Sequence, residues 1–165
     1  MKLQFRHQSF QLDAATAICD VFAGQPFHSP TYMVDPGIDL DAGEKQFALP
    51  EARKFTGFNN APVAISDDKV LEHIRALQRA GQIKPSDRLD GRYNLTVEME
   101  TGVGKTYTYI KTMYELNKRY GWSKFIIIVP SVAIREGVYK SFQITEEHFA
   151  EDYGKNIRYF IYNSA

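Results

Sequence analysis

The stretch VEMETGVGKTYTYIKTMYEL, residues 97–116, restricts the fold more than any other part of the chain. A run rich in β-forming residues leads into a turn that contains Gly102 and Gly104. A helical pattern then runs from about Gly104 to Tyr120 and stops at Gly121. A chain that passes from strand to helix through a tight glycine turn is typical of an α/β protein.

The residues after this turn repeat the same alternation. The run KFIIIVP is a continuous β-branched segment, as expected for a strand buried on both faces. We expect strands over 93–100, 124–130 and 157–163, a second helix from about Val132 to Ala150, and a loop over 150–153. Strands that alternate with helices imply right-handed crossovers and a parallel sheet, so residues 91–165 predict part of a RecA-like lobe.

Residues 1–90 predict an N-terminal extension. A helical pattern covers Gln8 to Gly24, and a second one follows Ser66, a good N-cap, and ends at Gly81. Between them, residues 25–62 show no sustained period and carry scattered prolines and glycines, which predicts a long irregular segment.

Composition adds a few limits. The 165 residues correspond to about one domain, and 20 basic residues balance 20 acidic ones, so net charge does not indicate nucleic-acid binding. The single cysteine, Cys19, can form no disulfide within the chain, which suits a reducing compartment. No apolar run approaches the ~20 residues that span a bilayer. We therefore expect a cytoplasmic protein with no membrane association.

The glycine turn matches the phosphate-loop pattern G-x-x-x-x-G-K-[ST] in its last three positions, Gly104, Lys105 and Thr106. Met99 stands at the first glycine position, which is a departure, and Gly102 supplies extra freedom within the loop. Glycines let backbone N–H groups turn around phosphate oxygens, and the helix start adds its unpaired N–H groups.

In this interpretation the loop from Thr101 through Val103 to Thr106 cradles the phosphates of ATP. Lys105 neutralises the β and γ phosphates, and the Thr106 hydroxyl binds Mg²⁺. The alternative is an ordinary helix start with a turn glycine, in which Lys105 is only a surface charge.

Two motifs resemble those of superfamily 2 helicases and translocases. METGVGKT resembles their A-x-T-G-x-G-K-T loop, and IIIVPSVAIREGVYKSF resembles their motif Ia. The second resemblance implies contacts with a nucleic-acid backbone from Pro130, Ser131, Arg135 and Lys140. The alternative is that Arg135 pairs with a nearby acid and that Lys140 is merely solvated.

A third motif lies upstream. SFQLDAA resembles the Q motif of the same superfamily, which implies that Gln11 reads the adenine edge. An amide suits this task because it donates and accepts at once. The alternative is a solvent-facing glutamine early in a helix.

Together, the start MKLQFRHQSFQLDAA and the stretch from LTVEMETGVGKT to GVYKSF resemble the restriction subunit (Res) of type III restriction–modification enzymes. The resemblance implies an ATP-driven motor on DNA that is joined to a nuclease. It also implies a methyltransferase partner (Mod) that reads the recognition sequence.

Several parts of such an enzyme are missing from the sequence. No D-E-x-x motif follows an apolar strand, and ITEEHF, which includes Glu146, Glu147 and His148, predicts a solvated helix end rather than a metal site. We therefore expect a truncated first part of a larger protein. The isolated chain should hydrolyse ATP only at background level and cleave no DNA.

Three other functions remain open: a superfamily 2 helicase without a nuclease, a phosphate-loop kinase, and a non-catalytic nucleotide-binding fragment. The Val-Pro-Ser segment and Gln11 argue against the kinase. The four histidines lack the spacing of zinc ligands, so no zinc site is expected. The aromatic side chains of Trp122, Tyr107, Tyr109 and Tyr114 are expected to pack against the sheet rather than to stack on bases.

Overall fold

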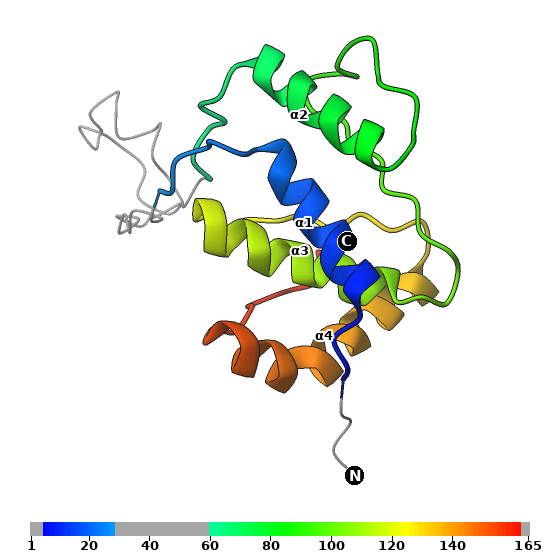
Figure 1. Cartoon of the computed structure of the whole chain (residues 1–165). Coiled ribbons are helices and arrows are strands. Elements are labelled where there is room, and N and C mark those ends of the chain that lie inside the picture. Colours follow the sequence, from blue (N-terminus) through cyan, green and yellow to red (C-terminus); the bar gives the residue numbers. More distant parts are fainter. Residues whose placement is uncertain (1–4, 29–59, 163–165) are drawn as a thin grey trace, which may run out of the picture.

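A computed structural model describes residues 5–28 and 60–162 of the chain. The described residues form four helices: α1 (Ser9–Val21), α2 (Asp67–Ala80), α3 (Lys105–Tyr120) and α4 (Val132–Tyr153). Helix α3 lies in the middle, with α1 on one side and α4 on the other, and α2 packs against α1 (Figure 1). Most of the predicted irregular segment, 25–62, lies outside the described residues.

Capping residues set the helix ends much as the sequence predicts. The Ser66 hydroxyl accepts the Lys69 N–H at the start of α2, and the Ser131 hydroxyl accepts the Ile134 N–H at the start of α4. Helix α3 ends at Gly121, whose φ of 77° lies in the left-handed region. The four predicted helices are therefore confirmed.

Two helix ends are displaced from the predicted positions. Helix α1 stops at Val21, and Gly24 lies beyond it in a following turn with φ 88°. Helix α4 continues to Tyr153, so the loop predicted over 150–153 is wrong. The predicted division near residue 90 falls between α2 and α3 and stays a prediction.

The predicted α/β fold with a RecA-like parallel sheet is wrong. No residue in 5–28 or 60–162 belongs to a β-strand. Within the described residues, the three segments expected to be strands form no ladder, and Tyr93 at the start of the first lies in a turn; residue 163 lies outside the described range. In the run at 124–130, Ile126 and Ile128 are 90% and 89% exposed, while Phe125 and Ile127 are 38% and 37% exposed. The run is therefore exposed on one face and partly covered on the other, instead of being buried on both.

The physical reason is that a β-branched run favours extended backbone, whereas a strand also needs a neighbour to pair with. At the start of this run the Asn60 side chain, and not a neighbouring strand, bonds to the backbone. The Asn60 side-chain oxygen accepts the N–H groups of Ser123 and Lys124 at 2.8 and 2.9 Å, and its amide donates to the Lys124 carbonyl at 2.7 Å. The backbone is thus held in place without a ladder.

The apolar core consists of two clusters on opposite sides of α3. The first joins α1, α2 and the end of α3 and contains Cys19, Val21, Phe22, Val70, Tyr120 and Trp122. The second joins α3 to α4 and contains Ile110, Met113, Tyr114, Phe142 and Phe149. Trp122 and Tyr114 are packed in these clusters, as expected for structural aromatics, although they pack on helices and loops rather than on a sheet.

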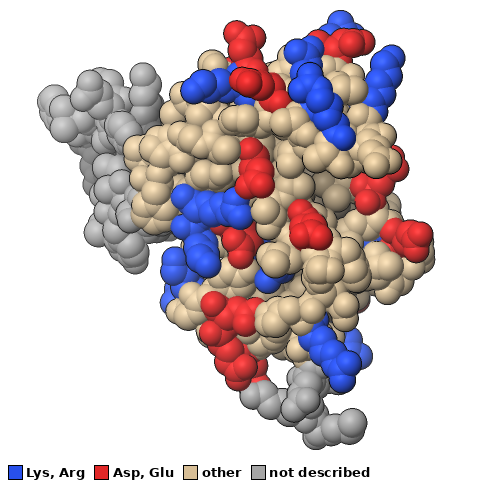
Figure 2. Space-filling model, in the orientation of Figure 1, with Lys and Arg blue, Asp and Glu red and all other residues tan. Residues whose placement is uncertain are grey.

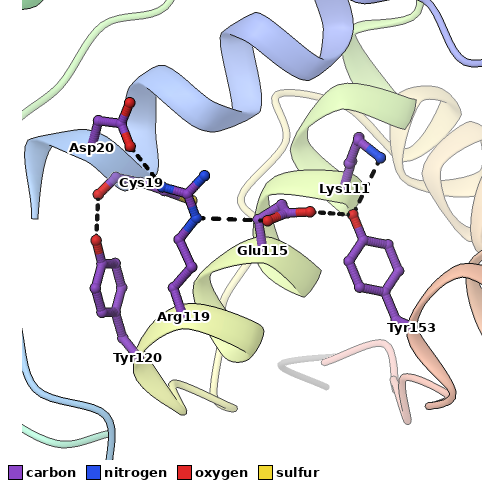
Figure 3. A network of polar contacts seen from close by, with 7 residues as sticks. All are labelled: Cys19, Asp20, Lys111, Glu115, Arg119, Tyr120 and Tyr153. Atoms are coloured by element: carbon purple, nitrogen blue, oxygen red, sulfur yellow. Dashed lines mark hydrogen bonds and ion pairs between the residues drawn. The ribbon is translucent and has the colours of Figure 1, made fainter. Parts of the chain in front are cut away.

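A chain of polar contacts along α3 connects its two neighbours (Figure 3). Arg119 donates to Asp20 of α1 at 2.6 Å and lies 3.7 Å from Glu115. Glu115 in turn accepts the Tyr153 hydroxyl of α4 at 2.7 Å. Lys111 donates to the same hydroxyl at 3.2 Å. Helices α1 and α4, which lie on opposite sides of α3, are therefore linked through side chains of α3.

The surface shows no dominant charge on the face in view. Acidic and basic side chains are interspersed there, in keeping with the balanced composition (Figure 2). Within the described ranges, no helix is long and apolar enough to cross a membrane.

Candidate functional site

The phosphate-loop motif forms an exposed turn that leads directly into α3. Residues 101–103 turn, and the helix begins at Lys105 with Gly104 as its N-cap. Gly102 and Gly104 have φ values of 85° and 90°, a region that side-chain-bearing residues rarely enter. A Cβ at Gly102 would meet nothing within 4 Å, so the space beside this glycine is open.

The start of α3 differs from the starts of α2 and α4. Serine hydroxyls cap those two helices, whereas no side chain within the described residues caps α3. The Gly104 carbonyl accepts the first helical bond from the Thr108 N–H at 3.0 Å. In any α-helix the N–H groups of the first turn have no partner inside the helix. Those at the start of α3 are therefore suited to bind an anion. Lys105 is exposed at this end, and Thr106 is half-buried.

Gln11 lies against this loop, although 92 residues separate it from Val103 in the sequence. Its amide nitrogen donates to the Val103 carbonyl at 2.8 Å, and the residue is only 9% exposed. A Cβ at Gly104 would lie 2.6 Å from the same nitrogen. Gln11 is therefore not the solvent-facing residue of the alternative interpretation. The structure brings it to the phosphate loop.

The residues of the motif Ia resemblance lie at the start of α4. Pro130 is exposed and precedes Ser131, whose hydroxyl caps the helix. Arg135 pairs with the adjacent Glu136 at 3.0 Å, and Lys140 is exposed. Arg135 thus has the acidic partner that the alternative interpretation anticipated, and its availability to a phosphate would require exchange of that partner.

Sequence reasoning missed a cluster beside the loop, formed by His7, His148 and Asp152. His148 and Asp152 lie one turn apart on α4, and their ligand atoms are 3.7 Å apart. His7 lies 3.7 Å from the other oxygen of Asp152. The structure thus brings His7 and His148 together, although their positions in the sequence show no ligand spacing. The i, i+4 spacing of His148 and Asp152 was visible in the sequence, but the predicted helix end at Ala150 left Asp152 in a loop.

The surroundings of His148 are aromatic and partly dry. Its ring nitrogen is 2.7 Å from the Tyr107 hydroxyl, and the Phe5 and Phe149 rings lie 5.2 Å away. Burial lowers the pKa of His148, while Asp152 opposes the change. Burial and then Asp152 raise the pKa of Tyr107 to about 12. Both shifts favour the uncharged forms of the two side chains, and which of them donates in the contact is set by the histidine tautomer.

A hollow of about 250 Å³ separates the segment before α1 from the first turns of α3. Its lining consists of His7, Gln8, Ser9, Leu12, Tyr107 and Lys111. Sites for whole drug-sized ligands are typically ~300–1,000 Å³. The hollow therefore has room for only part of a nucleotide.

Comparison with known proteins adds the decisive observation. The family model described as "Type III restriction enzyme, res subunit" matches residues 65–161, more than half of the chain. The chain belongs to this family. The match includes the loop before α3 but not Gln11, which enters the site through its contact with Val103.

Curated members of the Res family resemble the chain over part of their length. The EcoP15I Res subunit of Escherichia coli is 38% identical over 109 residues, and the EcoPI Res subunit of Escherichia phage P1 is 37% identical over 109 residues. Each match covers 64% of this chain and 11% of the relative. The StyLTI Res subunit of Salmonella typhimurium (strain LT2) is 44% identical over 69 residues, which is 41% of this chain and 7% of the relative. The chain thus spans about a tenth of the length of these relatives.

Proposed function

We propose that the chain binds ATP through the loop Thr101–Thr106, as part of the DNA motor of a type III restriction enzyme. The observation that carries the proposal is the pair of left-handed glycines before an uncapped helix start. Backbone N–H groups at such a start attract anions through their partial positive charge. Membership of the Res family gives this geometry a functional context.

The residues of the loop fit a triphosphate and its metal ion. Open space beside Gly102 lets a ligand approach the loop, and exposed Lys105 supplies a positive charge. The Thr106 hydroxyl would hold Mg²⁺, which neutralises phosphate charge in this class of site. Each exposed anion–dipole contact contributes only ~0.3–1 kcal/mol, so binding depends on Lys105 and several N–H groups acting together.

Gln11 has two roles in the proposal. Its amide nitrogen fixes the Val103 carbonyl and therefore the shape of the loop. The rest of the amide reads adenine, since an amide offers a second N–H and an acceptor oxygen to the base. Gln11 would then connect the loop that holds the phosphates to the recognition of the base.

DNA is the proposed substrate of the parent enzyme, and a methyltransferase subunit (Mod) is its proposed partner. Pro130, Ser131, Arg135 and Lys140 at the start of α4 would contact the sugar–phosphate backbone, which positions DNA without reading its sequence. Cleavage of DNA would be an activity of the parent enzyme. A cytoplasmic location is part of the same proposal, because foreign DNA is restricted there.

We propose that the isolated chain binds ATP without turning it over. The sequence lacks a D-E-x-x motif after an apolar strand, and such a carboxylate pair holds Mg²⁺ and orients water in motors of this kind. Glu146 and Glu147, the nearest candidates, are exposed on α4.

Calorimetric titration of the 165-residue chain with Mg·ATP tests the proposal. Lys105→Ala should weaken binding at least tenfold, equivalent to about 1.4 kcal/mol. Lys84→Ala, which removes another exposed lysine away from the loop, is the matched control and should leave affinity unchanged. Equal affinity of the Lys105 and Lys84 variants would show that the loop does not hold the phosphates.

A second titration separates the two roles of Gln11. If Gln11 reads adenine, Gln11→Ala should weaken ATP binding more than GTP binding. If Gln11 only shapes the loop, both nucleotides should lose the same factor. The second result would remove the adenine assignment and leave the phosphate site in place.

A further inference from the structure

A second site of a different kind lies beside the first turn of α3, where Tyr107 contacts His148. Within residues 5–28 and 60–162, one group of three His, Cys, Asp or Glu side chains brings its ligand atoms within 4.8 Å of one another. The group consists of His7, His148 and Asp152. It is composed of two imidazoles and one carboxylate, which distinguishes it from the clusters of acidic residues common on surfaces.

We propose that His7, His148 and Asp152 bind a divalent transition-metal ion, with Zn²⁺ as the best-suited ion. Imidazole nitrogen favours zinc and its neighbours in the first transition row, whereas Mg²⁺ prefers oxygen ligands alone. Two histidines and a carboxylate leave one position of a tetrahedral ion for water.

The distances are compatible with one ion shared by the three side chains, whose ligand atoms all lie within 4.8 Å of one another. Tetrahedral zinc with bonds of ~2.0–2.1 Å places its ligand atoms about 3.3 Å apart. The His7–Asp152 and His148–Asp152 distances are both 3.7 Å. One carboxylate thus lies between two imidazoles, with a different oxygen facing each of them. Only small movements of side chains would close the set around an ion.

The three residues also differ in how firmly they are held. The His148 side chain is 13% exposed and the Asp152 side chain 26% exposed, and both project from α4. The His7 side chain is 62% exposed and lies in the segment before α1. The helix therefore supplies a fixed pair, and His7 is the ligand free to approach. Binding would fasten the N-terminal segment to α4.

Tyr107 is a neighbour of the site and is not assigned as a ligand. Its hydroxyl lies 2.7 Å from the His148 ring nitrogen that would bind the ion. A neutral phenol that donates to this nitrogen competes with a metal ion for the same lone pair. Tyr107→Phe should therefore leave metal binding intact or tighten it several-fold.

Titration of the 165-residue chain with ZnCl₂, and with Co²⁺ followed by visible absorption, tests the assignment without nucleotide. At ~50 µM protein, we expect one equivalent to bind with micromolar affinity. His7→Ala and His148→Ala should each weaken binding at least tenfold, and Asp152→Asn should do the same. His28→Ala, which alters an exposed histidine outside the cluster, is the matched control. Far-ultraviolet circular dichroism checks that the helices persist in each variant.

Two outcomes would overturn the inference: no binding below about 1 mM, or binding that all three substitutions leave unchanged. Loss of binding in Tyr107→Phe would refute the three-ligand set. The result is independent of the nucleotide proposal, because Lys105→Ala should bind zinc as tightly as the unaltered chain does.

Discussion

Substitution of Gly104 by alanine offers a quantitative test of the contact between Gln11 and the phosphate loop. A Cβ at Gly104 would lie 2.6 Å from the Gln11 amide nitrogen, a distance too short for the two atoms to coexist. The end of the Gln11 side chain must then shift, which we expect to disrupt its bond to the Val103 carbonyl. Gly102 is a matched control, because its φ of 85° is close to the 90° of Gly104 but its Cβ would meet nothing within 4 Å.

The expected costs follow from these two environments. Gly102→Ala should lose about 1–2 kcal/mol of unfolding free energy from left-handed backbone alone. Gly104→Ala has the same strain and also disrupts the bond of a buried amide, which adds about 1–3 kcal/mol. Effects of alanine on the unfolded chain are common to both variants and cancel in the comparison. Gly104→Ala should therefore be the more destabilising by at least about 1 kcal/mol.

Urea unfolding followed by the fluorescence of Trp122, the single tryptophan, measures these energies. Trp122 is 8% exposed and therefore reports the loss of packing. The test is completed in a Gln11→Ala background, where the clash is absent and Gly104→Ala should cost no more than Gly102→Ala. Equal costs for the two glycines in both backgrounds would refute the placement of Gln11 against the loop.

Three further perturbations follow from other parts of the structure. Burial raises the pKa of Cys19 from 9.0 to about 12, against the opposing effect of Arg119, so the folded thiol keeps a proton that the unfolded thiol loses. Unfolding free energy should therefore fall as pH rises above about 9, by up to 1.4 kcal/mol per unit, and Cys19→Ala should flatten the slope between about pH 9 and 10 in urea titrations. Gly121→Ala should lose about 3 kcal/mol or more of unfolding free energy in thermal unfolding, because Gly121 has a φ of 77° and the new Cβ would overlap the backbone carbonyl of His28. A loss no greater than that of Gly102→Ala would contradict the contact. Lys140→Ala should lower the salt dependence of duplex binding by about one phosphate contact, with Lys84→Ala unchanged, and identical salt slopes would exclude Lys140 from the DNA surface.

The helices were predictable because their signals are local. Ser66, Ser131 and Gly121 fix helix ends through bonds to backbone only a few residues away. The family resemblance rested on short motifs in the correct order, and it too was confirmed. Each helix signal and each single motif is complete within a stretch of about twenty residues.

The absence of a sheet could not be predicted in the same way, because pairing is a relation between distant segments. The run at 124–130 has the composition of a buried strand, yet its first backbone groups bond to Asn60, more than sixty residues earlier. The Gln11–Val103 contact and the approach of His7 to Asp152 are likewise long-range. Motif reasoning assigned Gln11 to adenine and not to the Val103 carbonyl, and nothing local placed His7 beside α4.

The side chains aligned along α3 couple two apolar clusters that would otherwise share only a helix backbone. Glu115 contacts Arg119, whose other partner is Asp20 of α1, and it also accepts the Tyr153 hydroxyl of α4. A disturbance of either apolar cluster should therefore weaken a polar contact at the other. Amide exchange should accordingly slow or quicken on both sides of α3 in concert, rather than as two independent foldons. A nucleotide that tightened the start of α3 would then protect hydrogens well away from its own phosphates.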